Sequence, residues 1–219
     1  MSSKRGYGEA CPVAHSLDVI GDRWALLVLR ELRLGPRRFT DLQAALPQAG
    51  PTILSQRLRE LESHGVIERR WQKLYALTPW GAELEPVFRA LARWGMQSPN
   101  EREGDVTNDT VMLGVRTFWK APSPSWTADF TIRLGDDGYY LSIVDGEVAS
   151  LFRGEPPRAP SAALTTDRHT FARVTSRELT LPAAQKAGVL DLSGSREHAQ
   201  LLVSALSSSA ARRGSGVRT

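Results

Sequence analysis

Four polar residues are spaced along the sequence so that a helix would place them on one face. They are Thr52, Ser55, Gln56 and Arg59, at positions i, i+3, i+4 and i+7. Hydroxyl, amide and guanidinium groups hydrogen-bond base edges and phosphates in the major groove of DNA. Many surface helices are polar at such positions, so the assignment depends on the elements around the helix.

Those elements predict a helix-turn-helix. Leu54, Leu58 and Leu61 fall on the opposite face of the same helix, where they can cover a core. Gly50-Pro51 places proline at the first helical position, and residues 39–46 predict another short helix just before it. Two short helices separated by a turn, the second with a polar face, form the motif that enters the major groove.

A basic hairpin is predicted directly after the polar helix. Gly65 ends the helix, residues 66–70 and 74–77 have strand composition, and residues 71–73 form the turn. The hairpin predicts a winged helix whose positive tip meets phosphates or a minor groove, although a merely solvated hairpin is the alternative. The predicted DNA-binding residues outside the polar helix are Arg37, Arg38, Arg69, Arg70 and Lys73.

Local signals mark the other helices of this half. Asp22 is expected to cap a helix over residues 24–33, and Thr40 with Gln43 to form a capping box for the next one. Thr78-Pro79 predicts a further helix with an apolar stripe, which either covers the core or forms a dimer seam. The stripe consists of Leu84, Val87, Phe88, Leu91 and Trp94.

Several motifs in about the first 95 residues together resemble the HxlR-type winged-helix transcriptional regulators. They include Cys11-Pro12-Val13, the run 16–24, the run 54–61 and Leu77-Thr78-Pro79-Trp80-Gly81. The resemblance implies a homodimer held by the N-terminal segment and the helix after the wing, with the polar helices in the major grooves of a palindromic operator. The hairpin over residues 69–75 departs from the family, which usually has a longer hairpin with a Pro-Pro element.

Cys11 has two interpretations. A free cysteine near a helix start is commonly a small buried apolar residue, and we favour this interpretation. Alternatively, the helix N-terminus with nearby Lys4, Arg5 or His15 lowers the thiol pKa and makes Cys11 a redox or electrophile sensor. The resemblance adds weight to the second interpretation, because some family members sense oxidants through a cysteine at the matching motif.

Composition predicts two domains in a cytoplasmic protein. The chain has 219 residues and a net charge of +4; residues 1–100 hold 14 Lys/Arg against 10 Asp/Glu, and the remainder holds 14 against 14. We place a DNA-binding and dimerisation domain at 1–100 and a second domain at 106–206. A single cysteine and unclustered histidines predict no disulfide, metal or cofactor. No signal peptide or membrane span is evident.

The second half predicts a mixed α+β domain with a mostly antiparallel sheet. Strands alternate over residues 130–134, 139–144 and 147–152, with a further strand at 161–166 and helices at 167–173, 182–188 and 195–206. This order of elements, with Asp145-Gly146-Glu147-Val148 in the hairpin and Leu192-Ser193-Gly194 before the last helix, makes residues 106–206 similar to sterol-carrier-protein-2-like domains. The resemblance implies a sheet and helices around an apolar cavity. Residues 207–219 are expected to be disordered.

Six large aromatic side chains are the candidates for lining that cavity. They are Trp119, Trp126, Phe130, Tyr140, Phe152 and Phe171, and their alternative role is simply the hydrophobic core. No catalytic arrangement is evident, so we predict no enzyme. The leading hypothesis is a homodimeric transcriptional regulator that can respond to a small apolar or aromatic effector. The alternatives are a Cys11 sensor, or a lipid-like carrier or enzyme module on a winged-helix platform.

Overall fold

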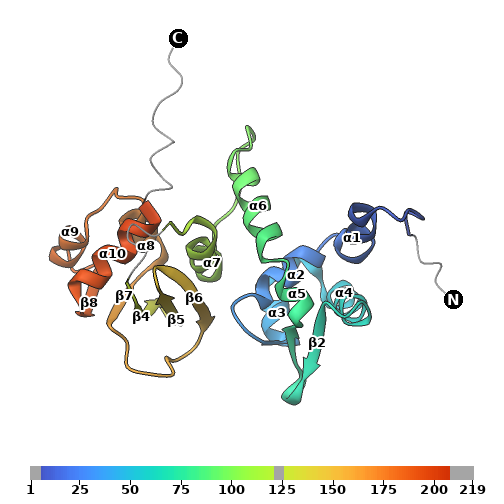
Figure 1. Cartoon of the computed structure of the whole chain (residues 1–219), viewed down its shortest axis with the longest axis horizontal. Helices are drawn as coiled ribbons and strands as arrows, with labels where there is room; N and C mark the ends of the chain where they lie inside the picture. Colours follow the sequence, from blue (N-terminus) through green and yellow to red (C-terminus); the bar gives the residue numbers. More distant parts are fainter. Residues whose placement is uncertain (1–5, 121–125, 208–219) are drawn as a thin grey trace, which may run out of the picture. The chain divides into compact units, whose positions relative to one another are not determined.

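The computed structural model describes residues 6–120 and 126–207, in two compact units that comprise residues 1–91 and 92–219 (Figure 1). Lys4, Arg5 and the predicted tail, apart from Ser207, lie outside the described residues. Among the described residues, no helix is long and apolar enough to cross a bilayer.

The first unit is a helical domain with a small antiparallel sheet. Its three strands lie in the order β1-β3-β2. Its elements are α1 (Pro12–Ile20), α2 (Ala25–Leu32), β1 (Arg37–Arg38), α3 (Phe39–Ala45), η1 (Pro47–Ala49), α4 (Pro51–Ser63), β2 (Ile67–Arg70), η2 (Trp71–Lys73), β3 (Leu74–Leu77), α5 (Pro79–Ala82) and α6 (Glu85–Met96), the last of which continues past residue 91.

Leucines of α4 anchor the core of this unit. Leu54, Leu58 and Leu61 are buried and pack with side chains of α2, as their common helical face predicts. Pro51 begins α4, and Gly65 follows its end with φ +72, a conformation that glycine adopts without strain. The predicted bounds of this helix are therefore confirmed.

Two predicted caps are wrong. Asp22 does not cap α2 with its side chain; its carboxylate instead pairs with Arg57 of α4, and α2 begins after Trp24, which has a left-handed φ of 79. The helix α3 starts at Phe39, where the backbone N–H of Arg38 donates to the Asp41 carboxylate at 3.0 Å. At the first cap, the ion pair with Arg57 therefore holds the Asp22 carboxylate away from the helix start. At the second, the Asp41 carboxylate takes the place of the predicted Thr40–Gln43 capping box.

The segment after the wing forms two helices instead of the predicted single one. Thr78 caps α5, since its hydroxyl accepts from the N–H of Gly81 at 3.0 Å. The chain turns at Glu83 and then continues as α6. Of the predicted stripe, Phe88 is buried and Leu84 packs against the core, while Val87, Leu91 and Trp94 are exposed.

The second unit contains a five-stranded mixed sheet. Its elements are α7 (Asn108–Phe118), β4 (Ala128–Leu134), β5 (Asp137–Val144), β6 (Glu147–Arg153), β7 (Ala162–Thr166), α8 (Arg168–Thr175), α9 (Leu181–Lys186), β8 (Leu190–Gly194) and α10 (Arg196–Ser207). The strand order is β6-β5-β4-β7-β8. β4 and β7 are parallel, with Phe130 opposite Ala162, while the other neighbours are antiparallel as predicted.

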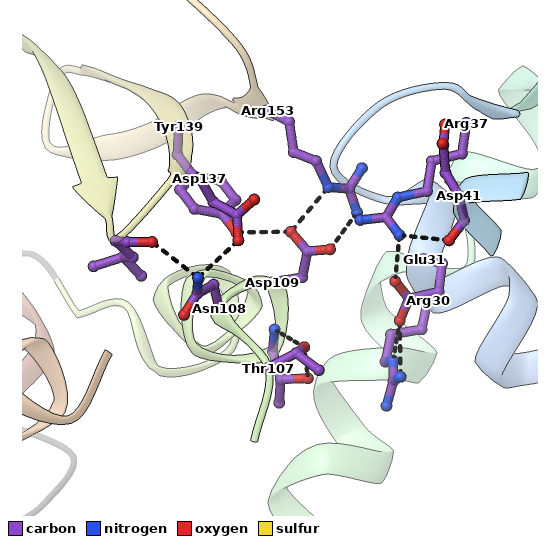
Figure 2. Close-up of polar contacts among 12 residues, drawn as sticks. Arg30, Glu31, Arg37, Asp41, Thr107, Asn108, Asp109, Asp137, Tyr139 and Arg153 are labelled. Carbon is purple, nitrogen blue, oxygen red and sulfur yellow. Dashed lines mark hydrogen bonds and ion pairs between the residues drawn. The ribbon is translucent and has the colours of Figure 1, made fainter. Parts of the chain in front are cut away.

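Two buried carboxylates connect neighbouring parts of this unit, one between helix and sheet and one within the sheet. Asp109 of α7 accepts from the Tyr139 hydroxyl at 2.8 Å and from the Arg153 guanidinium at 2.9 Å (Figure 2). Burial, followed by the negative charge of Asp109, raises the pKa of Tyr139. Asp129 of β4 accepts from the Tyr140 hydroxyl at 2.6 Å. These contacts satisfy polar groups that would otherwise destabilise the core.

Candidate nucleic-acid interface

The polar face of α4 lies on the surface, as its predicted role requires. Thr52, Gln56 and Arg59 are exposed and Ser55 is half-buried, while the leucines behind them are buried. Gln56 donates to Glu60 at 3.0 Å. Arg59 makes no hydrogen bond or ion pair within the described part of the chain, so its guanidinium is available to an external acceptor.

Two further residues of α4 refine this surface. Ile53 is 46% exposed beside Thr52 and Gln56, and an apolar side chain on such a face can contact a thymine methyl group. Ile53 was not among the predicted DNA-binding residues, although its position outside the leucine register was a usable signal. Arg57 points elsewhere and pairs with Asp22 and Glu60, so it supports the helix.

The wing is a short hairpin whose tip carries free positive charge. Arg69 lies opposite Tyr75 in the register, with its guanidinium carbon 5.9 Å from the centre of that ring. Arg70 pairs with Glu68 at 2.6 Å, which offsets part of its charge. Lys73 is exposed. Arg69 and Lys73 are therefore the tip cations that the first unit leaves without an acidic partner among its described residues.

The arginines before α3 have different surroundings. Arg38 is exposed, whereas the Arg37 side chain is only 14% exposed and lies 3.2 Å from the buried carboxylate of Glu31. Arg30 donates to the same carboxylate at 2.8 and 3.0 Å (Figure 2). Leaving Glu31 unpaired in the core would be strongly unfavourable, so Arg37 has a structural role whatever else it contacts.

Apolar side chains are exposed on α1 and α6. Val13 and Leu17 are one turn apart on α1. Val87, Leu91 and Trp94 follow one side of α6. Both segments are the ones predicted to mediate dimerisation, and exposed apolar rows of this kind mark interaction sites.

Cys11 is exposed, so the favoured prediction of a buried residue is wrong. The residue precedes α1, and the backbone N–H groups of Ala14 and Val13 hold the pKa of its thiol below the ordinary value. Helix initiation at Pro12 places the side chain outside the core, which the sequence motif alone did not reveal.

The second unit has a cavity of about 330 Å³ between its helices, a size typical of small-ligand sites. Its lining from α7, α8 and α10 includes Val111, Gly114, Phe118, Phe171 and Leu206. Of the six predicted aromatic residues, only Phe171 lines it. Trp119, Trp126 and Phe130 form a buried cluster, and Tyr140 packs on Phe152 with ring centres 5.0 Å apart.

No candidate metal-binding site is found in residues 6–120 and 126–207, because no three histidine, cysteine or acidic side chains there lie close enough to bind one metal ion. Two hydroxyls at the end of α8, beside the cavity, already have acceptors: Thr175 donates to the carbonyl of Phe171 at 2.9 Å, and Ser176 donates to the Glu178 carboxylate at 3.0 Å. The cavity is therefore mainly an apolar surface.

Comparisons with known proteins concern the first half of the chain. Residues 19–103 match the family model described as HxlR-like helix-turn-helix. A Synechocystis protein named an uncharacterized HTH-type transcriptional regulator is 40% identical over 94 residues, which are 40% of this chain and 70% of the relative. The HTH-type transcriptional regulator YodB of Bacillus subtilis is 32% identical over 94 residues, 40% of this chain and 84% of the relative.

A crystal structure of quinone-bound YodB aligns with a TM-score of 0.38 at 34% identity, covering 40% of this chain and all of that chain. The family match over residues 19–103 includes the α4 face and the wing, and both sequence relatives are named transcriptional regulators. The chain therefore belongs to the HxlR-like helix-turn-helix family of transcriptional regulators.

Proposed function

We propose that this regulator binds a palindromic operator as a homodimer, with one α4 helix in each of two major grooves. The exposed polar face of α4, supported from behind by buried leucines, is the observation that carries this proposal. The free cations of the wing add sequence-independent phosphate contacts. In this proposal, Arg59 and Gln56 read base edges, and Arg69 and Lys73 fix the orientation of the domain on the duplex.

The exposed apolar rows of α1 and α6 support the homodimer. Association of two copies would remove Leu17, Leu91 and Trp94 from water, and a two-fold interface of this kind presents the same surface on both subunits. A two-fold dimer also explains why the proposed operator is palindromic, since its half-sites are separated by about one helical turn.

Recovery of genomic fragments by the purified protein, followed by footprinting, tests the DNA-binding function. Arg59→Ala should lose the footprint at protein concentrations that protect it in the wild type. Arg173→Ala is a matched control, because Arg173 is also exposed but lies on α8 in the second unit. A footprint unaffected by Arg59→Ala would contradict the recognition face, and no DNA recovered at all would favour the carrier or enzyme alternative.

For the second unit, we propose an uncharged apolar or aromatic effector in the cavity beside Gly114. Among the described residues, no charged side chain lines this cavity, so a charged ligand would lose hydration without compensation. Phe171 is the predicted aromatic residue that belongs to the lining, and its ring offers a face for an aromatic ligand. The sterol-carrier-like classification of the domain stays a proposal supported by its mixed sheet and helices.

An effector changes DNA affinity only if it binds the DNA-competent and DNA-incompetent states differently. A library of neutral aromatic compounds, screened for a shift in melting temperature, would identify binders. A chain that ends at Asn100 should still bind operator but lose the response to any such compound. A retained response would contradict the second unit as the effector domain.

Exposure of Cys11 and the lowered pKa of its thiol support a second proposal, in which oxidants or electrophiles react at this residue. Peroxide or a quinone should then release DNA from the wild type but not from Cys11→Ser. Equal release from both proteins would contradict the thiol as the reactive group.

A further inference from the structure

The wing tip carries a tryptophan that the first unit does not bury. Trp71 is 88% exposed, and no large apolar side chain among the described residues is more exposed. An indole has a large apolar surface, and its burial would contribute substantially to an interface. Single exposed apolar residues are common on protein surfaces, so the surroundings of Trp71 decide its meaning.

The backbone beside Trp71 is held in an unfavourable conformation. Gln72 has φ 62 and ψ 22, and Lys73 has φ 59. Hairpin turns that need two left-handed residues favour asparagine and glycine, because other side chains are strained there. This tip instead keeps two long polar side chains next to an exposed indole. Strain without a packing benefit indicates that the side chains of the tip act outside the domain.

Cationic side chains flank Trp71 along the chain. Lys73, two residues after Trp71, is exposed, and Arg69, two residues before it, has its guanidinium over the Tyr75 ring. Among the described residues, neither cation has an acidic partner. An apolar protein partner would have to desolvate these cations, whereas a polyanion would gain from them. The wing also follows α4 after only three residues, so its tip continues the proposed DNA interface.

We propose that Trp71 is an apolar wedge that enters the minor groove of the operator next to the half-site contacted by α4. The inference rests on the proposed DNA-binding function. Arg69 and Lys73 contact phosphates on the two sides of the groove. Apolar side chains that enter a minor groove partly unstack a base step and widen the groove. Trp71 thereby contributes shape-dependent recognition, and the guanine amino group in the minor groove opposes its insertion.

The affinity for the operator and its dependence on salt concentration distinguish an apolar wedge at Trp71 from a contact between a cation and a phosphate. With an operator duplex selected from a random library by the full-length protein, Trp71→Ala should bind about tenfold more weakly. The slope of log affinity against log salt should stay unchanged, because no phosphate contact is lost. Lys73→Ala should instead reduce that slope by about one. Trp71→Phe, which keeps an aromatic wedge, should lie between Trp71→Ala and the wild type.

Replacing guanine with inosine in the operator tests whether Trp71 enters the minor groove. Inosine lacks the guanine amino group in the minor groove, so replacing guanine under the wing should tighten binding by the wild type but not by Trp71→Ala. DNA should also protect one indole from acrylamide quenching in the wild type, and this protection should be absent in Trp71→Phe.

Wild-type affinity for Trp71→Ala, a salt slope reduced by that variant, or equal inosine effects in both proteins would each overturn the wedge. If Arg59→Ala weakens binding while Trp71→Ala does not, only the wedge fails. If the wild type selects no duplex, the proposed DNA-binding function fails as well. Circular dichroism of each variant checks that the exposed substitution leaves the fold intact.

Discussion

Asp129→Asn should make the stability of the second unit less dependent on pH in acid. The carboxylate of Asp129 accepts from the Tyr140 hydroxyl at 2.6 Å and from both Nε and the terminal nitrogen of Arg158. The hydrogen bond from Arg158 is the main cause that lowers the pKa of Asp129 to about 2, and the bond from Tyr140 adds to it against the opposing effect of burial.

The magnitude follows from this pKa. A decrease from 3.8 to about 2 corresponds to about 2.4 kcal/mol of differential interaction. Because the Arg158 side chain is 60% exposed, solvent screens the pair, and we expect only about 1 to 1.5 kcal/mol. The sign is that of a depressed carboxyl pKa: the stabilisation is present above about pH 4 and is lost as the pH falls toward 2.

Urea unfolding, followed by tryptophan fluorescence between pH 6 and about pH 2, measures the effect. The free-energy difference between wild type and Asp129→Asn should be about 1 to 1.5 kcal/mol above pH 4 and should shrink toward pH 2. Asparagine keeps an acceptor for Tyr140, so the fold should survive. Asp136→Asn, at an exposed turn, controls for the chemical change. A difference that stays constant across this pH range would refute the reasoning.

Four other predictions concern function. Arg59→Ala and Gln56→Ala should each weaken operator binding by about 1 to 3 kcal/mol if base edges are read; gel-shift titration checks this, and wild-type affinity of both folded variants would contradict it. Cys11→Ser should leave resting DNA binding unchanged, since Cys11 is outside the α4 face and the wing; filter binding under reducing conditions would reveal any loss. Leu91→Glu should shift the sedimentation coefficient toward the monomer, because it places charge on the exposed apolar row of α6; an unchanged dimer would exclude this row. Gly114→Leu should abolish the thermal shift caused by any cavity ligand while Gly95→Leu, on α6, should retain it; a ligand shift that survives Gly114→Leu would place the ligand elsewhere.

Local chemistry made much of the first unit predictable. Gly50-Pro51 and Gly65 fixed the bounds of α4, and the three-residue tip at Trp71–Lys73 occurs where the sequence predicted a turn. The role of Arg37 was not predictable, because its partner Glu31 lies on an earlier helix and the sequence does not show that this carboxylate is buried. The exposure of Cys11 depended in the same way on how α1 is oriented.

The second unit shows the same division. Asp167 caps α8 as its local signal suggests, and Asp145-Gly146 forms the expected hairpin turn. The helix predicted to begin at Pro182 starts one residue earlier, at Leu181, where Thr180 caps it. The helix α7 was not predicted, although Thr107 caps it, because it is a single helix between the linker and a segment whose strand-like alternation is the clearer signal. Parallel pairing of β4 with β7 joins residues about thirty positions apart, and local periodicity contains no information about such pairing.

The attachment of the wing gives it freedom to change. Thr78 donates through its backbone N–H to the carbonyl of Val66 at 3.1 Å, and through its hydroxyl to that of Gly65 at 2.7 Å. A Cβ at Gly81 would clash with the Val66 carbonyl oxygen, so the chain on the two sides of the wing is locked together. Ile67, Tyr75 and Leu77 pack in or against the core and β3 also pairs with β1, so only the tip at residues 71–73 lies beyond this attachment. Insertions or deletions at this tip leave the register of α5 and α6 with α4 intact, and a lineage can lengthen or shorten the wing without rebuilding the rest of the domain.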